Sequence, residues 1–478
     1  MKDALQSKIA QGLTWAGLEK CAAKALRFVI GLVLARLLVP GDYGLIGMLG
    51  IFIGLSSLFV DSGFSAALIQ KKDRTEDDFA TVFWFNLVVA GVCYGVLFFA
   101  APFIAAFYKM PQLCAICRVV ALGIPLGALA SVPRLRLTVA LDFRPQTAIT
   151  LVSLVVSGSV AIGLAYRGKG VWALVAQTLV EASVSAVLLW LVAKMRPHWM
   201  FSMKSFQRFF AYGWKHLCSS LVNTVYVNSY SLLIGRVFGA AEIGYYTRAD
   251  AFAALPGETI TETVVRVNFP VLAEVQDDRE KLLDAYRRLL RTPLFLVTPI
   301  LLGLLATARP FVAVTIGEQW LPCVPLLQVI CVGMLFEPLT AINLNLLYVK
   351  GRTDCVLKLE LMKKPIAFAI VLAMVPLGIL WMCVGRAVYA FIAFAFNCHY
   401  TKKILDYGLL AQLREVLPIF MNGAIMCILV SLAQHILATQ CPWVQLLVCV
   451  PLGVISYLGV AWLTHDPSFR SLLRTLRK

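Results

Sequence analysis

Long uncharged apolar runs dominate this sequence and are separated by short polar connections. A helix needs about 20 mostly apolar residues to cross the hydrocarbon core of a bilayer. The runs lie near 12–38, 43–69, 79–107, 112–133, 146–166, 171–193, 209–238, 243–274, 289–308, 322–349, 355–375, 378–401, 415–437 and 443–464. We therefore expect an all-α polytopic membrane protein with about 14 transmembrane helices.

The composition agrees with this reading. Of 478 residues, 60% are hydrophobic and only 14% are charged, whereas soluble domains average roughly 25% charged residues. This excludes an ordinary soluble enzyme and a disordered chain. The alternating polarity of transmembrane β-strands is absent from the sequence. Thirteen cysteines are scattered through apolar segments, which is typical of small core side chains rather than of a disulfide framework.

The net charge of +17 follows a topological pattern. Lys and Arg concentrate in every second connection between the apolar runs, as the positive-inside rule requires of cytoplasmic segments. The intervening loops hold only four such residues, Lys109, Arg167, Lys169 and Arg309. This pattern predicts that both termini are cytoplasmic, and the basic charge needs no nucleic-acid partner.

Two windows repeat at an offset of 200 residues. LARLLVPGDYGLIGM at 34–48 aligns with IGRVFGAAEIGYYTR at 234–248. In this register the matched pairs are Arg36 with Arg236, Asp42 with Glu242, and Gly44 with Gly244. Six apolar runs separate the windows, so we expect two parallel six-helix halves. The predicted domains are an N-lobe at 1–200, a C-lobe at 201–408, two further helices at 409–464 and a basic cytoplasmic tail at 465–478.

Charged residues inside the apolar runs are candidates for function, because an unpaired charge at the bilayer centre costs about 2.5–3.5 kcal/mol on insertion scales. Lys24 and Arg27 share one face of the first run. They either pair with acids on neighbouring helices or form a cationic wall that faces an anionic solute. The further residues predicted to line a cationic substrate cavity are Lys215, Arg248 and Arg266.

The eighth run is predicted to contain a helix break at Pro256 and Gly257, just before Glu258 and Glu262. Broken helices with nearby acids are recurrent ion sites in transporters. With Asp61 of the second run, these two acids are our candidates for proton or Na+ coupling. Glu262 and Arg266 also have the spacing of an ordinary i, i+4 ion pair, so a structural role stays open.

The sequence contains no phosphate-binding GxxxxGK[ST] motif, and we identify no catalytic constellation, metal ligand set or cofactor site. We therefore expect a transporter rather than an enzyme.

Several motifs resemble a known family. They are Tyr43-Gly44-Leu45, Asp61-Ser62-Gly63-Phe64 leading to Ala67-Leu68-Ile69-Gln70, Phe83-Trp84-Phe85-Asn86, Asn268-Phe269-Pro270 before Gln276-Asp277-Asp278, and Gly317-Glu318-Gln319-Trp320 before Pro325-Leu326-Leu327-Gln328. In order and spacing they resemble the polysaccharide transporter (Wzx-type) family of the MOP flippase superfamily, and most of all its colanic-acid-type exporters. The resemblance extends from the first apolar run to the twelfth.

This resemblance implies two six-helix lobes arranged as a V, with a cavity that opens alternately to each side. It also implies a bacterial inner-membrane flippase for undecaprenyl-pyrophosphate-linked oligosaccharides in exopolysaccharide, O-antigen or capsule assembly. Implied partners are the lipid-linked substrate, membrane lipids, a polysaccharide polymerase and a chain-length regulator. The last two helices resemble the pair that forms a lipid-tail groove in lipid II flippases.

Two alternatives remain. A cation-coupled, multidrug-type antiporter of the same superfamily would usually have twelve helices. A membrane glycosyltransferase or polymerase should have a large external loop with catalytic acids, but the longest such loop, near 309–321, holds only Glu318.

Overall fold

The computed structural model describes residues 2–71, 73–194 and 201–470. Within these helices, side chains are described for all positions except 2–16, 18, 66, 212, 215, 216, 219, 262–270 and 353. The described chain is helical and contains no strand. This confirms the predicted all-α membrane class.

The chain divides into two compact units, 1–244 and 245–478. The helices of the first are α1 (Lys2–Leu37), α2 (Pro40–Asp61), α3 (Phe64–Gln70), α4 (Glu76–Tyr108), α5 (Gln112–Val120), α6 (Gly123–Val139), α7 (Phe143–Tyr166), α8 (Val171–Ala193) and α9 (Met203–Val237). Helix α10 (Ala240–Glu274) begins in unit 1 and continues into unit 2.

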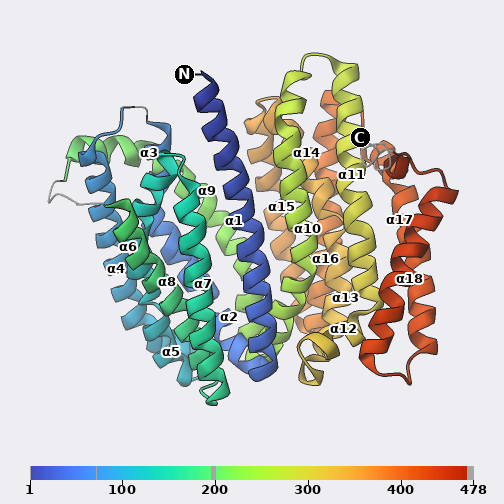
Figure 1. Ribbon diagram of the computed structural model, residues 1–478, viewed down its shortest axis with the longest axis horizontal. Helices are drawn as coiled ribbons and strands as arrows, with labels where there is room; N and C mark the ends of the chain where they lie inside the picture. The colour runs from blue at the N-terminus through green and yellow to red at the C-terminus, as the bar shows by residue number, and fades with distance from the viewer. Residues whose placement is uncertain (1, 72, 195–200, 471–478) are drawn as a thin grey trace. The chain divides into compact units, whose positions relative to one another are not determined.

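Unit 2 contains the remaining helices, which Figure 1 colours from yellow-green to red. They are α11 (Arg279–Ala306), α12 (Ala308–Thr315), α13 (Cys323–Met334), α14 (Glu337–Val349), α15 (Thr353–Met374), α16 (Ile379–Leu405), α17 (Leu409–Ile436) and α18 (Pro442–Leu463), with short 3-10 turns η1 (Glu318–Trp320) and η2 (Val375–Leu377). The two compact units are defined by how tightly the chain packs, whereas the lobe boundary predicted at 200 was defined by the sequence repeat. The predicted lobe boundary therefore stays a prediction.

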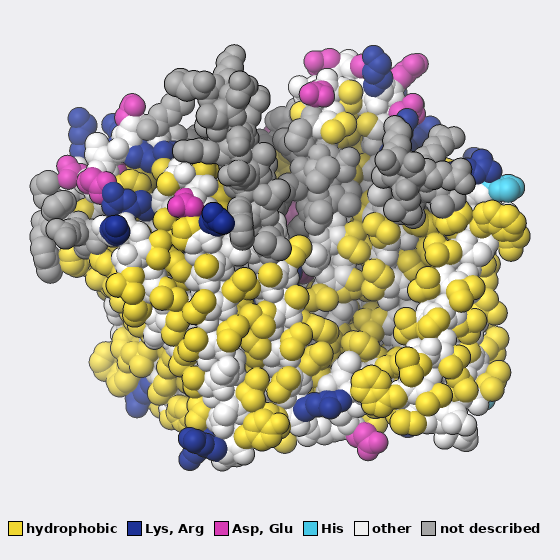
Figure 2. All heavy atoms as spheres, in the orientation of Figure 1, with side chains coloured by type: hydrophobic (Ala, Val, Ile, Leu, Met, Phe, Trp, Pro, Cys, Tyr) yellow, Lys and Arg dark blue, Asp and Glu magenta, His cyan; other side chains and the backbone are white. Residues whose placement is uncertain are grey.

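Ten segments of the described chain are long and apolar enough to span a membrane. Four other helices, α1, α9, α10 and α15, are also at least 22 residues long but carry more charge. The predicted total of fourteen spans therefore stays a prediction. Figure 2 shows that hydrophobic side chains cover the middle of each unit on the visible face, and that charged ones gather near the helix ends.

Three of the predicted spans are interrupted. The span at 43–69 is divided into α2 and α3. The other two are interrupted near a proline. The span at 112–133 is divided into α5 and α6, and the span at 322–349 is divided into α13 and α14. In each case a proline, Pro125 or Pro338, lies in the first turn of the second helix, where its ring and missing N–H disfavour continuation of the preceding helix. These are the fourth spans of the two predicted halves, which supports the internal repeat.

Polar residues fix where several helices begin. The Thr75 hydroxyl accepts a hydrogen bond from the Asp78 amide at 3.3 Å, and the Asp78 carboxylate accepts one from the Thr75 amide at 2.9 Å. Asp278 caps α11 in a similar way by accepting from the Lys281 amide at 3.2 Å. Such caps satisfy amides that have no partner within the helix.

The two windows of the repeat contact each other within unit 1. A Cβ atom added to Gly44 of α2 would overlap the carbonyl oxygen of Ala240, and one added to Gly244 of α10 would overlap that of Pro40. Positions 40 and 240 are themselves equivalent at the offset of 200. The contact is therefore reciprocal, and it explains why both windows carry glycine at this position.

The predicted helix break at Pro256 and Gly257 is wrong at the level of secondary structure, because α10 is helical without interruption from Ala240 to Glu274. A proline removes one backbone hydrogen bond, and helices in membrane proteins tolerate this loss where neighbouring groups compensate. Prolines also lie inside continuous α4, α11 and α17.

Candidate functional site

The predicted cationic face of α1 contains an ion pair. Arg27 Nη2 lies 2.8 Å from Glu181 Oε1 of α8, although 55% of the arginine side chain is exposed. For Arg27 the alternative of pairing with a neighbouring acid is therefore the one observed. Lys24 lies one turn earlier and is half-buried. One turn before that, Glu19 accepts a hydrogen bond from Thr150 of α7 at 2.8 Å.

A cavity of about 520 Å³ lies in unit 1 between α6 and α8, beside this ion pair. Arg134 on α6 donates a hydrogen bond through Nη2 to the Ser185 hydroxyl on α8 at 3.1 Å. Glu181 also lines the cavity. Its full lining is Gly127, Ala130, Ser131, Arg134, Gln177, Thr178, Glu181, Ala182 and Ser185.

Among the candidate coupling acids, Asp61 is the last residue of α2, is exposed and accepts a hydrogen bond from the Ser65 hydroxyl. Glu258 is exposed on α10. Within the described residues, no group of three His, Cys, Asp or Glu side chains could hold a metal ion. The side chains of Lys215, Glu262 and Arg266 lie outside the described residues.

Unit 2 contains a cluster of embedded charges. Arg386 Nη1 on α16 lies 2.6 Å from Asp250 Oδ1 and 2.7 Å from the Tyr246 hydroxyl, both on α10. Arg248, predicted to line the substrate cavity, is half-buried on the same helix. Glu337, at the start of α14, interacts electrostatically with Arg386.

The most buried base of this cluster was missed in the sequence. Lys363 on α15 is 3% exposed, and its Nζ lies 2.7 Å from Glu360 Oε1 and 3.2 Å from Asn397 Oδ1 of α16. Lys364 lies 3.5 Å from the other Glu360 oxygen. The spacing Glu360-x-x-Lys363-Lys364 indicates an i, i+3 or i, i+4 ion pair, but it does not indicate burial.

Hydrogen-bonded amides connect this cluster to α17. Asn343 Nδ2 donates to Gln412 Oε1 at 3.0 Å, and Gln412 Nε2 donates back to Asn343 Oδ1 at 3.1 Å. Thr401 of α16 donates to the same Asn343 oxygen. All three side chains are fully buried. Because buried polar groups are costly unless they are paired, this reciprocal bond ties α17 to α14.

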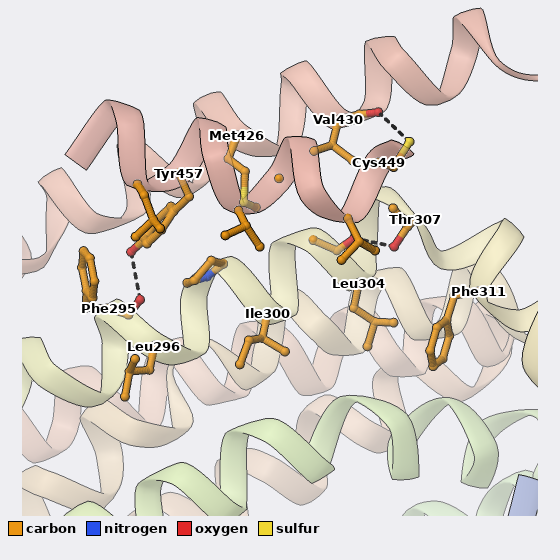
Figure 3. Close-up of a pocket in the computed structure, with 16 residues that line it drawn as sticks. Phe295, Leu296, Ile300, Leu304, Thr307, Phe311, Met426, Val430, Cys449 and Tyr457 are labelled. Atoms are coloured by element: carbon orange, nitrogen blue, oxygen red, sulfur yellow. Dashed lines mark hydrogen bonds between the residues drawn. The ribbon is translucent and has the colours of Figure 1, made fainter. Parts of the chain in front are cut away.

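An apolar groove of about 490 Å³ lies in unit 2 between α11, α12, α17 and α18 (Figure 3). Ile300 and Leu304 line it from α11, and Met426 lines it from α17. The Tyr457 hydroxyl donates to the Phe295 carbonyl at 3.0 Å, so its polar atom is satisfied by the backbone. The remaining lining is Leu296, Pro299, Gly303, Thr307, Phe311, Val430, Cys449, Val450, Gly453, Val454 and Leu458.

Comparison with known proteins places the chain in a family. A family model described as "Polysaccharide biosynthesis protein" matches residues 33–325. Teichuronic acid biosynthesis protein TuaB of Bacillus subtilis (strain 168) is 26% identical over 480 residues, covering 98% of each chain. Succinoglycan biosynthesis transport protein ExoT of Rhizobium meliloti (strain 1021) is 27% identical over 344 residues, covering 72% of this chain and 69% of that protein.

A solved structure of the lipid II flippase MurJ, in an inward closed conformation, has a similar fold. The TM-score is 0.77 at 14% sequence identity, and the match covers 96% of this chain and 100% of that one. These findings confirm the resemblance to polysaccharide transporters that the sequence motifs indicated. Because the family model covers more than half of the sequence, the chain belongs to the polysaccharide biosynthesis protein family.

Proposed function

We propose that this protein is a flippase that moves undecaprenyl-pyrophosphate-linked oligosaccharide units across the bacterial inner membrane by alternating access. The units would supply exopolysaccharide, O-antigen or capsule assembly. The observation that carries this proposal is the apolar groove on α11, α17 and α18. Relatives named for polysaccharide biosynthesis and transport support it, as does the fold shared with a lipid II flippase.

The groove suits a prenyl chain because its walls are almost entirely aliphatic, aromatic or sulfur-containing side chains. Within a bilayer the tail is already out of water, so apolar surface is held in such a groove by van der Waals packing and not by transfer from water. A polyisoprenyl tail presents only such surface, whereas a small cationic drug would need polar partners. The groove thus favours a lipid-linked substrate over a multidrug-type antiporter.

The saccharide and phosphate part of the substrate would need polar surroundings. Lys24, Arg27 and Arg248 have described side chains that are half-buried or exposed, and together with Lys215 and Arg266 they are our proposed cationic lining. Arginine binds phosphate and carboxylate through two parallel hydrogen bonds. Asp61, Glu258 and Glu262 remain our candidates for H+ or Na+ coupling.

The positive-inside pattern of the sequence supports placing both termini in the cytoplasm. In that orientation the substrate is taken up from the inner leaflet and released outside. We further propose that a polysaccharide polymerase and a chain-length regulator receive the translocated units.

The groove can be tested in a bacterial strain that lacks its own exporter and carries this chain with the biosynthetic genes of its cognate glycan. Ile300→Trp would place an indole ring in the groove and obstruct it, while Ile428→Trp places the same bulk on α17 at an exposed position that does not line it. We expect Ile300→Trp to lower surface polymer and raise the pool of lipid-linked units, with Ile428→Trp close to wild type. Equal polymer yields from both variants, at equal membrane insertion, would contradict a role for the groove. Efflux of cationic dyes by a chain that restores no polymer would favour the antiporter.

A further inference from the structure

The cavity between α6 and α8 is lined by both charged and neutral polar side chains. Its polar lining consists of a guanidinium, a carboxylate, a carboxamide and three hydroxyls, contributed by Arg134, Glu181, Gln177, Ser131, Thr178 and Ser185. Its volume of about 520 Å³ lies within the roughly 300–1,000 Å³ of typical small-molecule sites.

The two helices present these groups as matched stripes. Ser131 and Arg134 lie three residues apart on α6, and Gln177, Glu181 and Ser185 follow each other at intervals of four residues on α8. Residues three and four apart share a helix face. The polar groups therefore converge on one space, as expected of a binding site.

The charges in this space do not cancel. Arg27 forms a 2.8 Å ion pair with Glu181 and so offsets its negative charge. Arg134 forms no ion pair with a described acid; its side chain donates one hydrogen bond, to the neutral Ser185 hydroxyl. The cavity is thus left with one positive charge in excess. In unit 2, by contrast, Arg386 and Lys363 each have an acid as partner.

The backbone at Arg134 is held in place. Its carbonyl oxygen accepts hydrogen bonds from the Gln146 side chain at 2.8 Å and from the Thr138 hydroxyl at 3.0 Å. The Gln146 amide nitrogen also donates to Thr138 at 2.8 Å. These bonds fix the backbone from which the exposed Arg134 side chain projects, and the bond from Nη2 to the Ser185 hydroxyl orients its guanidinium.

We propose that this cavity is a subsite for one carboxylate-bearing sugar residue of the translocated glycan. Arg134 binds the carboxylate, for which its fork of N–H donors is matched. The hydroxyls of Ser131 and Thr178, the Gln177 amide and the free oxygen of Glu181 bind sugar hydroxyls. One positive charge in excess matches one carboxylate better than it matches a pyrophosphate, which carries at least two negative charges. The inference rests on the proposed function.

Binding to the purified full-length protein provides the first test. The probes are methyl glucuronide, methyl glucoside and inorganic pyrophosphate, followed by ligand-observed NMR. We expect the wild type to prefer the glucuronide over the glucoside and Arg134→Gln to weaken glucuronide binding by about tenfold or more. Arg134→Lys should retain part of the preference for the glucuronide, because lysine keeps the positive charge but lacks the paired N–H donors of the guanidinium.

Arg136→Gln is the matched control, because Arg136 lies on the same helix but pairs with Glu76 at 2.7 Å and does not line the cavity. It should bind glucuronide like the wild type. Equal binding of glucuronide and glucoside by the wild type would overturn the subsite. So would glucuronide binding that Arg134→Gln and Arg134→Lys leave unchanged, or a site that pyrophosphate occupies in preference to the glucuronide.

A second test compares initial rates of translocation in proteoliposomes for two lipid-linked glycans that differ only in one uronate-for-hexose replacement. We expect Arg134→Gln to lower the ratio of acidic to neutral rates about tenfold, and Arg136→Gln to leave that ratio at its wild-type value. If Arg134→Gln leaves this ratio unchanged, the result contradicts the subsite but not the proposed function. Failure of the wild-type protein to move either glycan contradicts the proposed function, and the binding experiment then decides on the subsite independently.

Discussion

Gly44 packs directly against the backbone of Ala240, at a point where even a Cβ atom would overlap the alanine carbonyl oxygen. The reciprocal contact, Gly244 against Pro40, is its equivalent after a shift of 200 residues. Matching glycines in the two windows are therefore explained by a mutual close approach. The repeat that is visible in the sequence has a direct structural consequence.

Replacement of either glycine by alanine should destabilise the protein. Overpacking in a close-packed region typically costs about 1–3 kcal/mol, and here the obstacle is backbone that cannot move aside as a side chain can. We expect Gly44→Ala and Gly244→Ala each to lower the thermal unfolding temperature in detergent. Gly41→Ala is the control, because a Cβ at Gly41 meets no atom within 4 Å. A similar unfolding temperature for all three variants would refute the close contact.

The Arg27–Glu181 pair should control the charge of the unit 1 cavity. Arg27→Ala leaves the Glu181 carboxylate unpaired and removes the positive excess at Arg134. We expect this variant to lower export of an acidic polymer severalfold, and Arg27→Ala/Glu181→Gln to recover most of the loss. Polymer yield at equal protein level is the measurement. If the double variant exports no more polymer than Arg27→Ala alone, the role of Arg27 is not to compensate the charge of Glu181.

Lys363 should be more sensitive to removal of its charge than the exposed Lys358 on the same helix. Lys363→Met leaves Glu360 with the more distant Lys364, and we expect a loss of about 1–3 kcal/mol. Lys358→Met should change the unfolding temperature little. Glu360→Leu takes the shared carboxylate from Lys363 and Lys364 and should also lower stability, and Lys363→Met/Glu360→Leu should lose less than the sum of the two single variants because residues in contact are not additive. A loss of stability in the double variant equal to the sum of the two single losses would contradict this coupling.

The amide pair Asn343–Gln412 is expected to hold α17 against α14. Gln412→Leu leaves the buried Asn343 without two hydrogen bonds, which should cost about 1–3 kcal/mol. A double-mutant cycle with Asn343→Leu isolates the coupling, because residues in direct contact are not additive. We expect the double variant to lose less stability than the sum of the two single variants. Strict additivity would show that the pair contributes no coupling.

The helical class and the family could be predicted from the sequence because long apolar runs and ordered motifs are local properties. The sequence could not predict which prolines interrupt a helix. Pro125 and Pro338 lie at breaks, whereas Pro256 lies inside continuous α10. That difference depends on which neighbours replace the lost hydrogen bond. The predicted helix break failed for this reason.

The candidate site shows the same limit. The embedded Arg27 was recognisable from its place in an apolar run, but its partner Glu181 lies 154 residues away and only packing brings the two together. Lys363 lies inside the predicted span at 355–375, so its charge within an apolar run was a sequence signal, but its depth of burial follows only from packing against Asn397 of α16. Arg134 lies just beyond the predicted fourth span, at 112–133, whereas α6 extends to Val139 and brings Arg134 opposite Ser185.

The most direct test of the central claim is transbilayer movement of a lipid-linked glycan by the purified protein. A fluorescent undecaprenyl-pyrophosphate-linked oligosaccharide is placed in both leaflets of proteoliposomes, and a membrane-impermeant quencher is added outside. The account predicts that quenching proceeds past the outer-leaflet half at a rate that rises with the amount of protein and falls in Ile300→Trp. Quenching that stops at the outer leaflet, with correctly folded and inserted protein, would contradict it.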